Sequence, residues 1–254
     1  MVRSEIGNLR ALSRKDIDAL LKPESSFDGW VRVMIELERL NLPGMQGYIT
    51  RGANRVFCYL IHGLKLSSVL EIGNRSGHST VGLALALKHR TGADRRMVSI
   101  DKTDWNDIKN YRRKFGLDCM PQRSLNKVDC ASFVEFIVGS STKVLPKLKQ
   151  RFDFVFIDGS HRTEIVLADV LNSFRLLNPG GIIVLHDYYP HLKPLWPHRP
   201  KISKGPYLAM VEVMKRHPEV HVMSLNDLPW INCWEPSHKT VLAVVARKIG
   251  GKNE

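Results

Sequence analysis

The sequence predicts an α/β fold in which a doubly wound sheet of seven strands, mostly parallel with an antiparallel edge strand, follows an N-terminal helical cap. Between about residues 67 and 187, five short apolar runs alternate with helical segments, and strands in such a series return in parallel through right-handed crossovers. The last two apolar runs are joined by a loop rather than by a helix, which indicates an antiparallel addition at one edge.

The N-terminal cap is predicted from helical periodicity interrupted by proline and glycine. Residues 13–40 read as an amphipathic helix that Pro23 breaks, and Pro43 and Gly44 end it with a turn. A second helical stretch covers residues 53–64, and neither stretch contains a catalytic pattern. We therefore expect a cap over residues 1–62 and one main domain over residues 63–250, because no low-complexity linker divides the remainder.

In the main domain the period of the apolar residues changes from helical to that of buried strands. The predicted strands cover residues 67–73, 97–101, 133–138, 152–158, 181–187, 220–225 and 241–246. The predicted helices between them cover residues 78–89, 142–149, 163–177 and 206–217. Four acidic residues end the apolar strands of the series: Glu71, Asp101, Asp158 and Asp187. Burial alone would not favour acids there, so they mark a site at the carboxyl ends of the strands.

The composition places the chain among ordinary globular proteins and excludes several classes. With 43% hydrophobic and 25% charged residues it is expected to fold rather than stay disordered. No run approaches the ~20 apolar residues of a membrane span, and the first residues lack the apolar core of a signal peptide, so we predict a cytoplasmic protein with no membrane partner. The four cysteines form no C-x-x-C pair, which argues against a zinc site and against a disulfide framework.

The formal net charge of +13 leaves two interpretations open. The basic residues are dispersed and fit a solvated surface, but they also fit an anionic partner, either a nucleic acid or an anionic small molecule. A long loop over residues 188–206 adds prolines, aromatic residues and cations beside the predicted site, where it would act as a lid or as a plain surface loop. Trp230 and Trp234 would line the same pocket or cover the sheet edge.

The turn after the first strand reads E-I-G-N-R-S-G-H-S over residues 71–79. Its two glycines let backbone approach a ligand at a helix N-terminus, but their spacing is not that of the dinucleotide-binding G-x-G-x-x-G. The turn resembles that of the class I S-adenosylmethionine-dependent methyltransferases, in the variant found in O-methyltransferases of the catechol and caffeoyl-coenzyme A kind. This resemblance implies a Rossmann-like fold and S-adenosylmethionine as the cofactor.

The resemblance also implies roles for single residues. The turn would hold the methionine part of the cofactor through Gly73, Asn74, Gly77 and Ser79, with Glu71 orienting the turn or the cofactor amine. Asp101 would accept hydrogen bonds from the ribose hydroxyls, Ser140 would meet the adenine ring, and Asp158 would lie beside the cofactor. The alternatives are a plain strand-to-helix turn for the glycines and a helix N-cap for Asp101.

A second pair of motifs, F-I-D-G-S-H over residues 156–161 and P-G-G-I-I-V-L-H-D over residues 179–187, resembles a bacterial group of class I enzymes that methylate sugars or natural products. Two mechanisms stay open. Asp158 and Asp187 would hold magnesium, or His161 would act as general base, and we expect His161 and Asp187 to be the catalytic residues. His186 stands where the caffeoyl-type pattern has aspartate, and imidazole is a poor magnesium ligand.

We therefore predict an S-adenosylmethionine-dependent O-methyltransferase acting on a small or conjugated hydroxylated metabolite, with an anionic acceptor as one option. Two alternatives remain. Methylation of RNA is favoured by the charge but lacks an N-P-P-Y motif, and a non-catalytic cofactor-binding module is disfavoured by the retained Asp158 and Asp187. A homodimer is a further option that the sequence leaves open.

Overall fold

The computed structural model describes residues 6–22, 29–42, 49–90, 92, 94–195, 201–226 and 240–249. Its seven strands form one sheet in the order β3-β2-β1-β4-β5-β7-β6. The strands are β1 (Ser68–Ile72), β2 (Arg96–Asp101), β3 (Val134–Val138), β4 (Phe152–Ile157), β5 (Leu177–Leu185), β6 (Val220–Ser224) and β7 (Ala243–Arg247). The helices are α2 (Arg14–Leu20), α3 (Gly29–Arg39), α4 (Arg51–Gly63), α5 (His78–Lys88), α6 (Ile108–Phe115), α7 (Pro121–Lys127), α8 (Ser141–Val144), α9 (Thr163–Leu176) and α10 (Gly205–Arg216).

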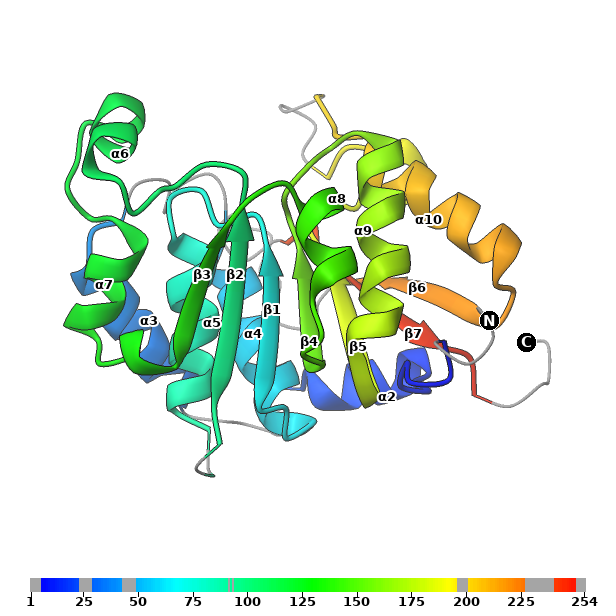
Figure 1. The fold of residues 1–254 in the computed structure, drawn as a ribbon. Coiled ribbons are helices and arrows are strands. Elements are labelled where there is room, and N and C mark those ends of the chain that lie inside the picture. The colour runs from blue at the N-terminus through cyan, green and yellow to red at the C-terminus, as the bar shows by residue number, and fades with distance from the viewer. Residues whose placement is uncertain are drawn as a thin grey trace.

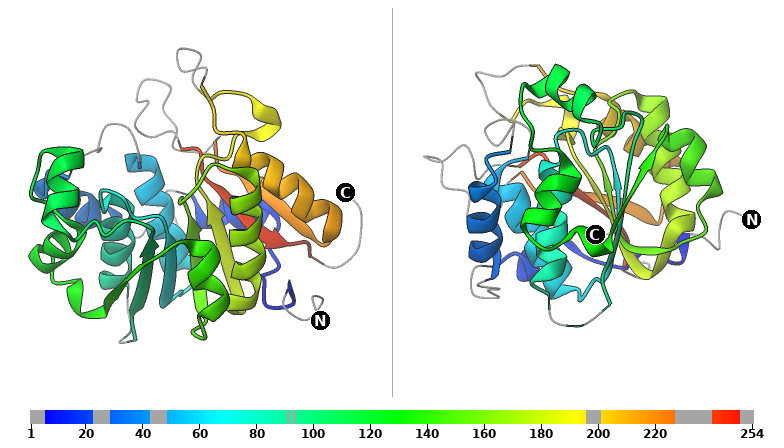
Figure 2. Two further views of the ribbon diagram at one scale, coloured as in Figure 1. Left: turned by 45° about the horizontal axis from the view of Figure 1, so that its top comes forward. Right: turned by 60° about the vertical axis from the view of Figure 1, so that its left-hand side comes forward.

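The sheet is covered by helices on both faces, so the fold has three layers (Figure 1). Helices α3, α4, α5 and α7 lie on one face, and α8, α9 and α10 lie on the other, as the edge-on view in Figure 2 confirms. Two hydrophobic clusters separate accordingly: one joins the cap helices and α5 to the sheet, and the other joins α9 and α10 to its opposite face. Central strands β1 and β4 are apolar along most of their length because both of their faces are buried.

The predicted doubly wound sheet is confirmed. Strands β1 to β5 pair in parallel, and β7 pairs antiparallel with both β5 and β6. The antiparallel addition lies at one edge of the sheet, as predicted, with β7 one position in from the edge and β6 at the edge itself. Two helices that were not delimited from the sequence, α6 and α7, fill the connection between β2 and β3.

The N-terminal segment runs along the lower part of the sheet before α2 begins. Leu9 bridges to Gly181 and Ala11 bridges to Arg247, both in the parallel sense. The backbone of Arg10 donates a hydrogen bond to the carbonyl of Gly181 (2.8 Å) and accepts one from Arg247 (2.9 Å). Since Leu9 is also 1% exposed and belongs to the core cluster of α9, this part of the cap shares its packing with the sheet.

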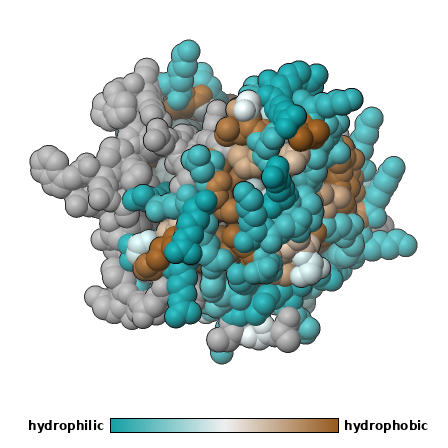
Figure 3. Space-filling model, turned by 90° about the vertical axis from the view of Figure 1, so that its left-hand side faces the viewer, coloured by the Kyte–Doolittle hydropathy of each residue, from teal (hydrophilic) through white to brown (hydrophobic). Residues whose placement is uncertain are grey.

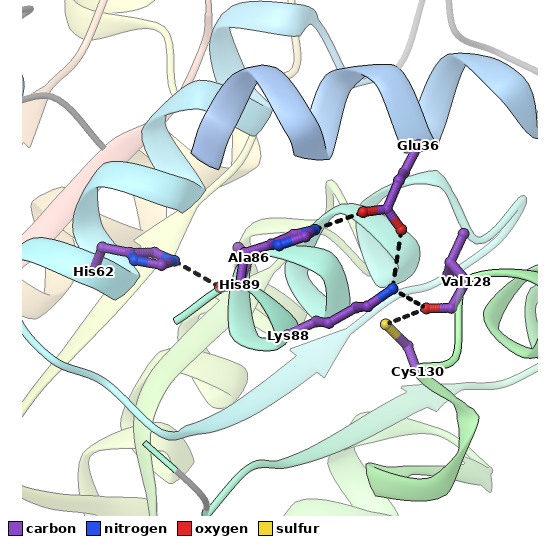
Figure 4. Close-up of polar contacts among 7 residues, drawn as sticks. All are labelled: Glu36, His62, Ala86, Lys88, His89, Val128 and Cys130. Carbon is purple, nitrogen blue, oxygen red and sulfur yellow. Dashed lines mark hydrogen bonds and ion pairs between the residues drawn. The ribbon is translucent and has the colours of Figure 1, made fainter. Parts of the chain in front are cut away.

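A polar tether holds helix α3 of the cap against helix α5 (Figure 4). The carboxylate of Glu36 on α3 pairs with the ammonium of Lys88 at 3.1 Å and with the imidazole of His89 at 2.6 Å. Lys88 also donates to the backbone carbonyl of Val128 at 2.9 Å, in the segment that leads to β3. Burial would raise the pKa of Glu36, but its bonds to His89 and Lys88 outweigh burial and lower it.

The surface is polar over the side that carries α6 and α7. Figure 3 shows hydrophilic side chains across most of its described part, with only small apolar patches between them. Helix α6 supplies a cluster of basic residues at its end: Arg112, Arg113 and Lys114. Among the described residues, every helix falls short of the length and apolarity that crossing a membrane requires.

Candidate functional site

The site lies where the strand order reverses. Strands β1 and β4 are neighbours, but the chain leaves β1 toward β2 and leaves β4 toward β5, so the loops after them separate. A cavity of about 540 Å³ opens there, at the carboxyl ends of the strands, and a smaller hollow of about 250 Å³ adjoins it. The two share the residues Gly73, Asp101, Lys102 and Gly159 and so form one elongated recess. Its size is within the range of small-molecule sites.

Most of the predicted site residues meet in this recess. The larger cavity is lined by Gly73, Asn74, Ser79, Asp101, Asp158, His161 and Asp187, and the smaller hollow by Ser140. Two predicted residues, Glu71 and Gly77, line neither space, because Glu71 is buried beneath the turn and Gly77 is a buried residue of the turn that packs against Pro121.

At the glycine turn, the backbone that follows β1 lies very close to the backbone that follows β4. Gly73 adopts a φ of 95°, and a Cβ at this position would lie 2.5 Å from the carbonyl oxygen of Asp158. Any other residue would therefore push the ends of β1 and β4 apart and would meet a strained backbone. Gly77 has a φ of 84° and serves as N-cap of α5, which directs the start of that helix toward the recess. The sequence pattern thus has a steric cause at both glycines.

Asp101, at the end of β2, holds the glycine turn in place. One of its carboxylate oxygens accepts hydrogen bonds from the amides of Asn74 and Arg75, each at 3.1 Å, and the other accepts from the amide of Thr103 at 3.0 Å. A carboxylate offers about four acceptor positions, so capacity remains for a ligand hydroxyl. The residue is half-buried and lines both spaces of the recess.

Glu71 is the buried support of the same turn. Its carboxylate is fully buried and accepts hydrogen bonds from the hydroxyls of Ser79 (2.5 Å), Thr80 (2.6 Å) and Ser99 (2.6 Å). Burial raises the pKa of Glu71 to about 7, and the three hydroxyl donors oppose this rise. The carboxylate therefore faces buried hydroxyl groups rather than the recess, and it fixes the first turn of α5 to strands β1 and β2.

A cluster of two acids and two histidines forms the wall opposite the glycine turn. Asp158 follows β4, Asp187 follows β5 with a φ of 53°, and His161 comes from the loop between β4 and α9. Nε2 of His161 lies 2.5 Å from Asp187, and Nδ1 of His186 lies 3.1 Å from Asp158 and 3.6 Å from Asp187. The adjacent motifs of the sequence therefore converge on one point in space.

Each group of the cluster changes the protonation of the others. Burial would raise the pKa of Asp187, but its bonds to His161 and His186 hold that pKa well below the usual range. The hydrogen bond to Asp187 raises the pKa of His161. Burial would lower the pKa of His186, but the charges of Asp158 and Asp187 raise it well above the usual value. Asp187 is therefore ionised at neutral pH, and it raises the affinity of both imidazoles for a proton.

The same groups can hold a cation. One ligand atom from each of Asp158, His161 and Asp187 lies within 4.8 Å of the others. Two carboxylates suit a hard divalent ion, whereas the imidazole is a better ligand for manganese or iron than for magnesium. The donor set therefore fits a divalent metal but is not specific for magnesium.

Several lining residues were not singled out from the sequence. Ile49, His78, Lys102, Trp105 and Lys114 all line the larger cavity. Among them, His78 could have been predicted from the sequence, because it directly follows the second glycine of the turn. Of the predicted lid, residues 196–200 lie outside the described residues, as do Trp230 and Trp234.

Comparisons with known proteins agree with this geometry. Residues 70–188 match the family described as methyltransferase domain. Catechol O-methyltransferase of Mycobacterium tuberculosis is 28% identical over 153 residues, which cover 60% of this chain and 59% of that protein. The match thus spans about three fifths of the curated relative.

Solved structures share the fold over nearly the whole chain. The O-methyltransferase TomG of Streptomyces achromogenes, involved in tomaymycin synthesis and solved with S-adenosylmethionine, is 19% identical with a TM-score of 0.57, covering 88% of this chain and 91% of that one. The O-methyltransferase of Bacillus cereus, solved with S-adenosylhomocysteine, is 17% identical with a TM-score of 0.57, covering 97% and 100%. Residues 70–188 thus match a methyltransferase domain family, and the chain shares its fold with these solved methyltransferases.

Proposed function

We propose that the chain is an S-adenosylmethionine-dependent O-methyltransferase that acts on a hydroxyl group of a small molecule. One observation carries this proposal: Asp101 and the His161–Asp187 pair line the same cavity of about 540 Å³. The recess fits the cofactor because it is elongated, has glycine backbone in its wall and keeps an acid at the end of β2. When bound, the cofactor supplies a methyl group activated by a sulfonium.

His161 is proposed as the general base for the acceptor hydroxyl. Its Nε2 lies 2.5 Å from the carboxylate of Asp187, so the tautomer that donates from Nε2 leaves the lone pair on Nδ1 free to accept a proton. Asp187 then orients the imidazole and stabilises the imidazolium that forms. The imidazole is 51% exposed, which leaves it reachable for an acceptor.

Metal-assisted transfer is the second candidate, because Asp158, His161 and Asp187 converge within 4.8 Å. These residues would hold a divalent ion, magnesium as predicted from the sequence or manganese as the imidazole favours. The ion would supply charge stabilisation for an ionised acceptor hydroxyl. A chelator separates the two mechanisms: full activity in chelator supports His161 alone, whereas loss that added metal restores supports the metal.

The acceptor is proposed to carry an anionic group. Lys102 and Lys114 line the cavity, are exposed, and form no ion pair within the described residues. Cations at the mouth of a cavity raise the local concentration of an anion. The curated relative suggests catechol as the first acceptor to test, and a carboxylated catechol should be preferred over the parent compound.

Calorimetric titration and a methyl-transfer assay test the proposal together. S-adenosylhomocysteine should bind at one site, and labelled methyl groups should pass from S-adenosylmethionine to a hydroxylated acceptor. No binding at millimolar cofactor would refute the proposal, and binding without transfer to any hydroxylated compound would favour the non-catalytic module. Filter binding of RNA at graded salt tests the remaining alternative. The cytoplasmic location and the homodimer stay predictions.

A further inference from the structure

The start of helix α10 packs directly on the main chain of His161. Helix α10 lies beside α9, and the loop that leads into α9 carries His161 (Figure 1). Gly205 is the first residue of α10 and is buried. A Cβ at this position would lie 2.6 Å from the carbonyl carbon of His161 and would overlap its carbonyl oxygen. Only glycine therefore lets α10 begin where it does.

The backbone conformation of Gly205 does not by itself require glycine. Gly205 is absent from the glycines with positive φ, so its φ is one that other residues adopt without strain. Alanine also favours a helix over glycine by about 1 kcal/mol. The contact with the main chain of His161 is therefore the reason for a glycine at this position.

His161 depends on this contact because little else fixes it. Its imidazole is 51% exposed, and its side chain is held by the single bond to Asp187. Neither its main-chain N–H nor its carbonyl forms a hydrogen bond within the described part of the chain. The backbone of His161 is therefore positioned by packing, and Gly205 supplies the surface on which its carbonyl lies.

The same turn of α10 also holds the chain next to Asp187. Asp187 has a φ of 53°, a conformation that a residue other than glycine keeps only where its surroundings hold it. The next residue, Tyr188, is 6% exposed, and its ring packs on that of Tyr207 with the centroids 5.9 Å apart. Tyr207 is the third residue of α10. The first turn of α10 is therefore in contact with the chain at both sides of the His161–Asp187 pair.

We propose that Gly205 and Tyr207 are positioning residues of the reaction site. Gly205 sets the backbone of His161. Tyr207 acts through Tyr188 on the chain beside Asp187. Both residues line neither the larger cavity nor the adjoining hollow, so they do not touch a ligand there. The inference rests on the proposed function, because it takes His161 to act at the acceptor hydroxyl.

Gly205→Ala tests the contact with His161. The added methyl group must move α10 or the His161 backbone, because it meets main-chain atoms. A displacement of about 1 Å slows a reaction about 100-fold, so the kcat for a carboxylated catechol should fall about 10- to 100-fold. The Kd for S-adenosylhomocysteine should stay within about twofold. In the NMR spectrum of the ligand-free protein, the imidazole resonance of His161, assigned by its loss in His161→Ala, should shift.

Tyr207→Leu loosens the same turn without adding bulk, so it keeps the test available if Gly205→Ala does not fold. The substitution removes the ring contact with Tyr188. The kcat should fall about 10-fold while the Kd for S-adenosylhomocysteine stays unchanged. The imidazole resonance of His161 should shift in this variant as well, because its partner Asp187 is less firmly held.

The matched control is Gly82→Ala. Gly82 is a buried residue of α5, and a Cβ there would overlap Oδ1 of Asn54 on α4. The control thus introduces the same methyl group into another tight helix contact. It should lower the melting temperature but leave both kcat and the resonance of His161 unchanged. The comparison separates a displacement of His161 from a general loss of stability.

The outcomes separate this inference from the proposed function. An unchanged kcat or an unchanged His161 resonance in both α10 variants would overturn the inference. Equal losses in Gly82→Ala, or equal losses of kcat and of S-adenosylhomocysteine affinity, would also overturn it, because they would indicate a general disturbance of the fold. If the unaltered protein neither bound S-adenosylhomocysteine nor transferred a methyl group, the proposed function would fail. The resonance of His161 in the ligand-free variants would then still show whether α10 positions this residue.

Discussion

Replacing Glu71 by glutamine should stabilise the protein at alkaline pH and change little at acid pH. The carboxyl is fully buried and its pKa rises from 4.5 to about 7 on folding. Between these pH values the folded state binds more protons than the unfolded state, so stability falls as pH rises. Each pKa unit corresponds to about 1.4 kcal/mol, which gives a loss of about 3 kcal/mol between pH 4 and pH 8 from this one group.

Urea unfolding at several pH values measures this effect. The amide oxygen of glutamine can accept from Thr80 and Ser99, and its NH2 can donate to the hydroxyl of Ser79. Since the amide carries no charge, the free energy of unfolding of the variant should exceed that of the unaltered protein by about 3 kcal/mol at pH 8. The difference should shrink toward pH 5. A difference that is constant with pH, or one that favours the unaltered protein at pH 8, would refute the reasoning.

Asp153→Asn is a control, because it should change the pH dependence of stability in the opposite direction. Burial would raise the pKa of Asp153, but hydrogen bonds from Asn178, Ser67 and Ser68 lower it. A lowered folded pKa stabilises the protein above the unfolded value and loses that stability as pH falls through the folded value. The free energy of unfolding of the asparagine variant should therefore be lower than that of the unaltered protein at neutral pH. This difference should disappear at acid pH.

Three further predictions concern the site and the cap. Asp101→Ala should weaken S-adenosylhomocysteine binding about 10- to 100-fold in calorimetry, and unchanged affinity would remove the ribose assignment. Asp187→Asn should slow methyl transfer about 10²- to 10⁴-fold at constant cofactor affinity, and unchanged turnover would remove its catalytic role. Glu36→Gln should lower the melting temperature by about 3 °C, corresponding to about 1 kcal/mol for a partly exposed charge pair in a domain of this size. An unchanged melting temperature would mean that the tether adds nothing to stability.

The sheet could be predicted because its central strands are apolar on both faces. Strands β1, β4 and β5 are buried along most of their length, so their apolar runs are uninterrupted in the sequence. The glycine turn was readable for a different reason: both of its glycines adopt positive φ, and Gly73 meets the backbone of Asp158. Because the backbone at these two positions requires glycine, the local sequence pattern was sufficient to predict the turn.

Features that depend on distant partners could not be predicted. Helix α6 is only 8 residues long and buries only Tyr111, so it adds little to the apolar core that a sequence pattern reveals. Strand β5 begins at Leu177, before the expected residue 181, because Asp153 and the N-terminal segment hold that region from either side. The contact of Gly205 with the main chain of His161 is likewise a property of the folded protein and not of its neighbours in sequence.

The contacts of residues 9–11 bear on how the chain completes its folding during synthesis. The backbone groups that these residues bond belong to Gly181 and Arg247, which leave the ribosome much later than residues 9–11. Until then Ile6 and Leu9, each 1% exposed in the finished protein, must stay solvated or be shielded by a chaperone. Closure of the base of the sheet therefore waits until Arg247 has left the ribosome.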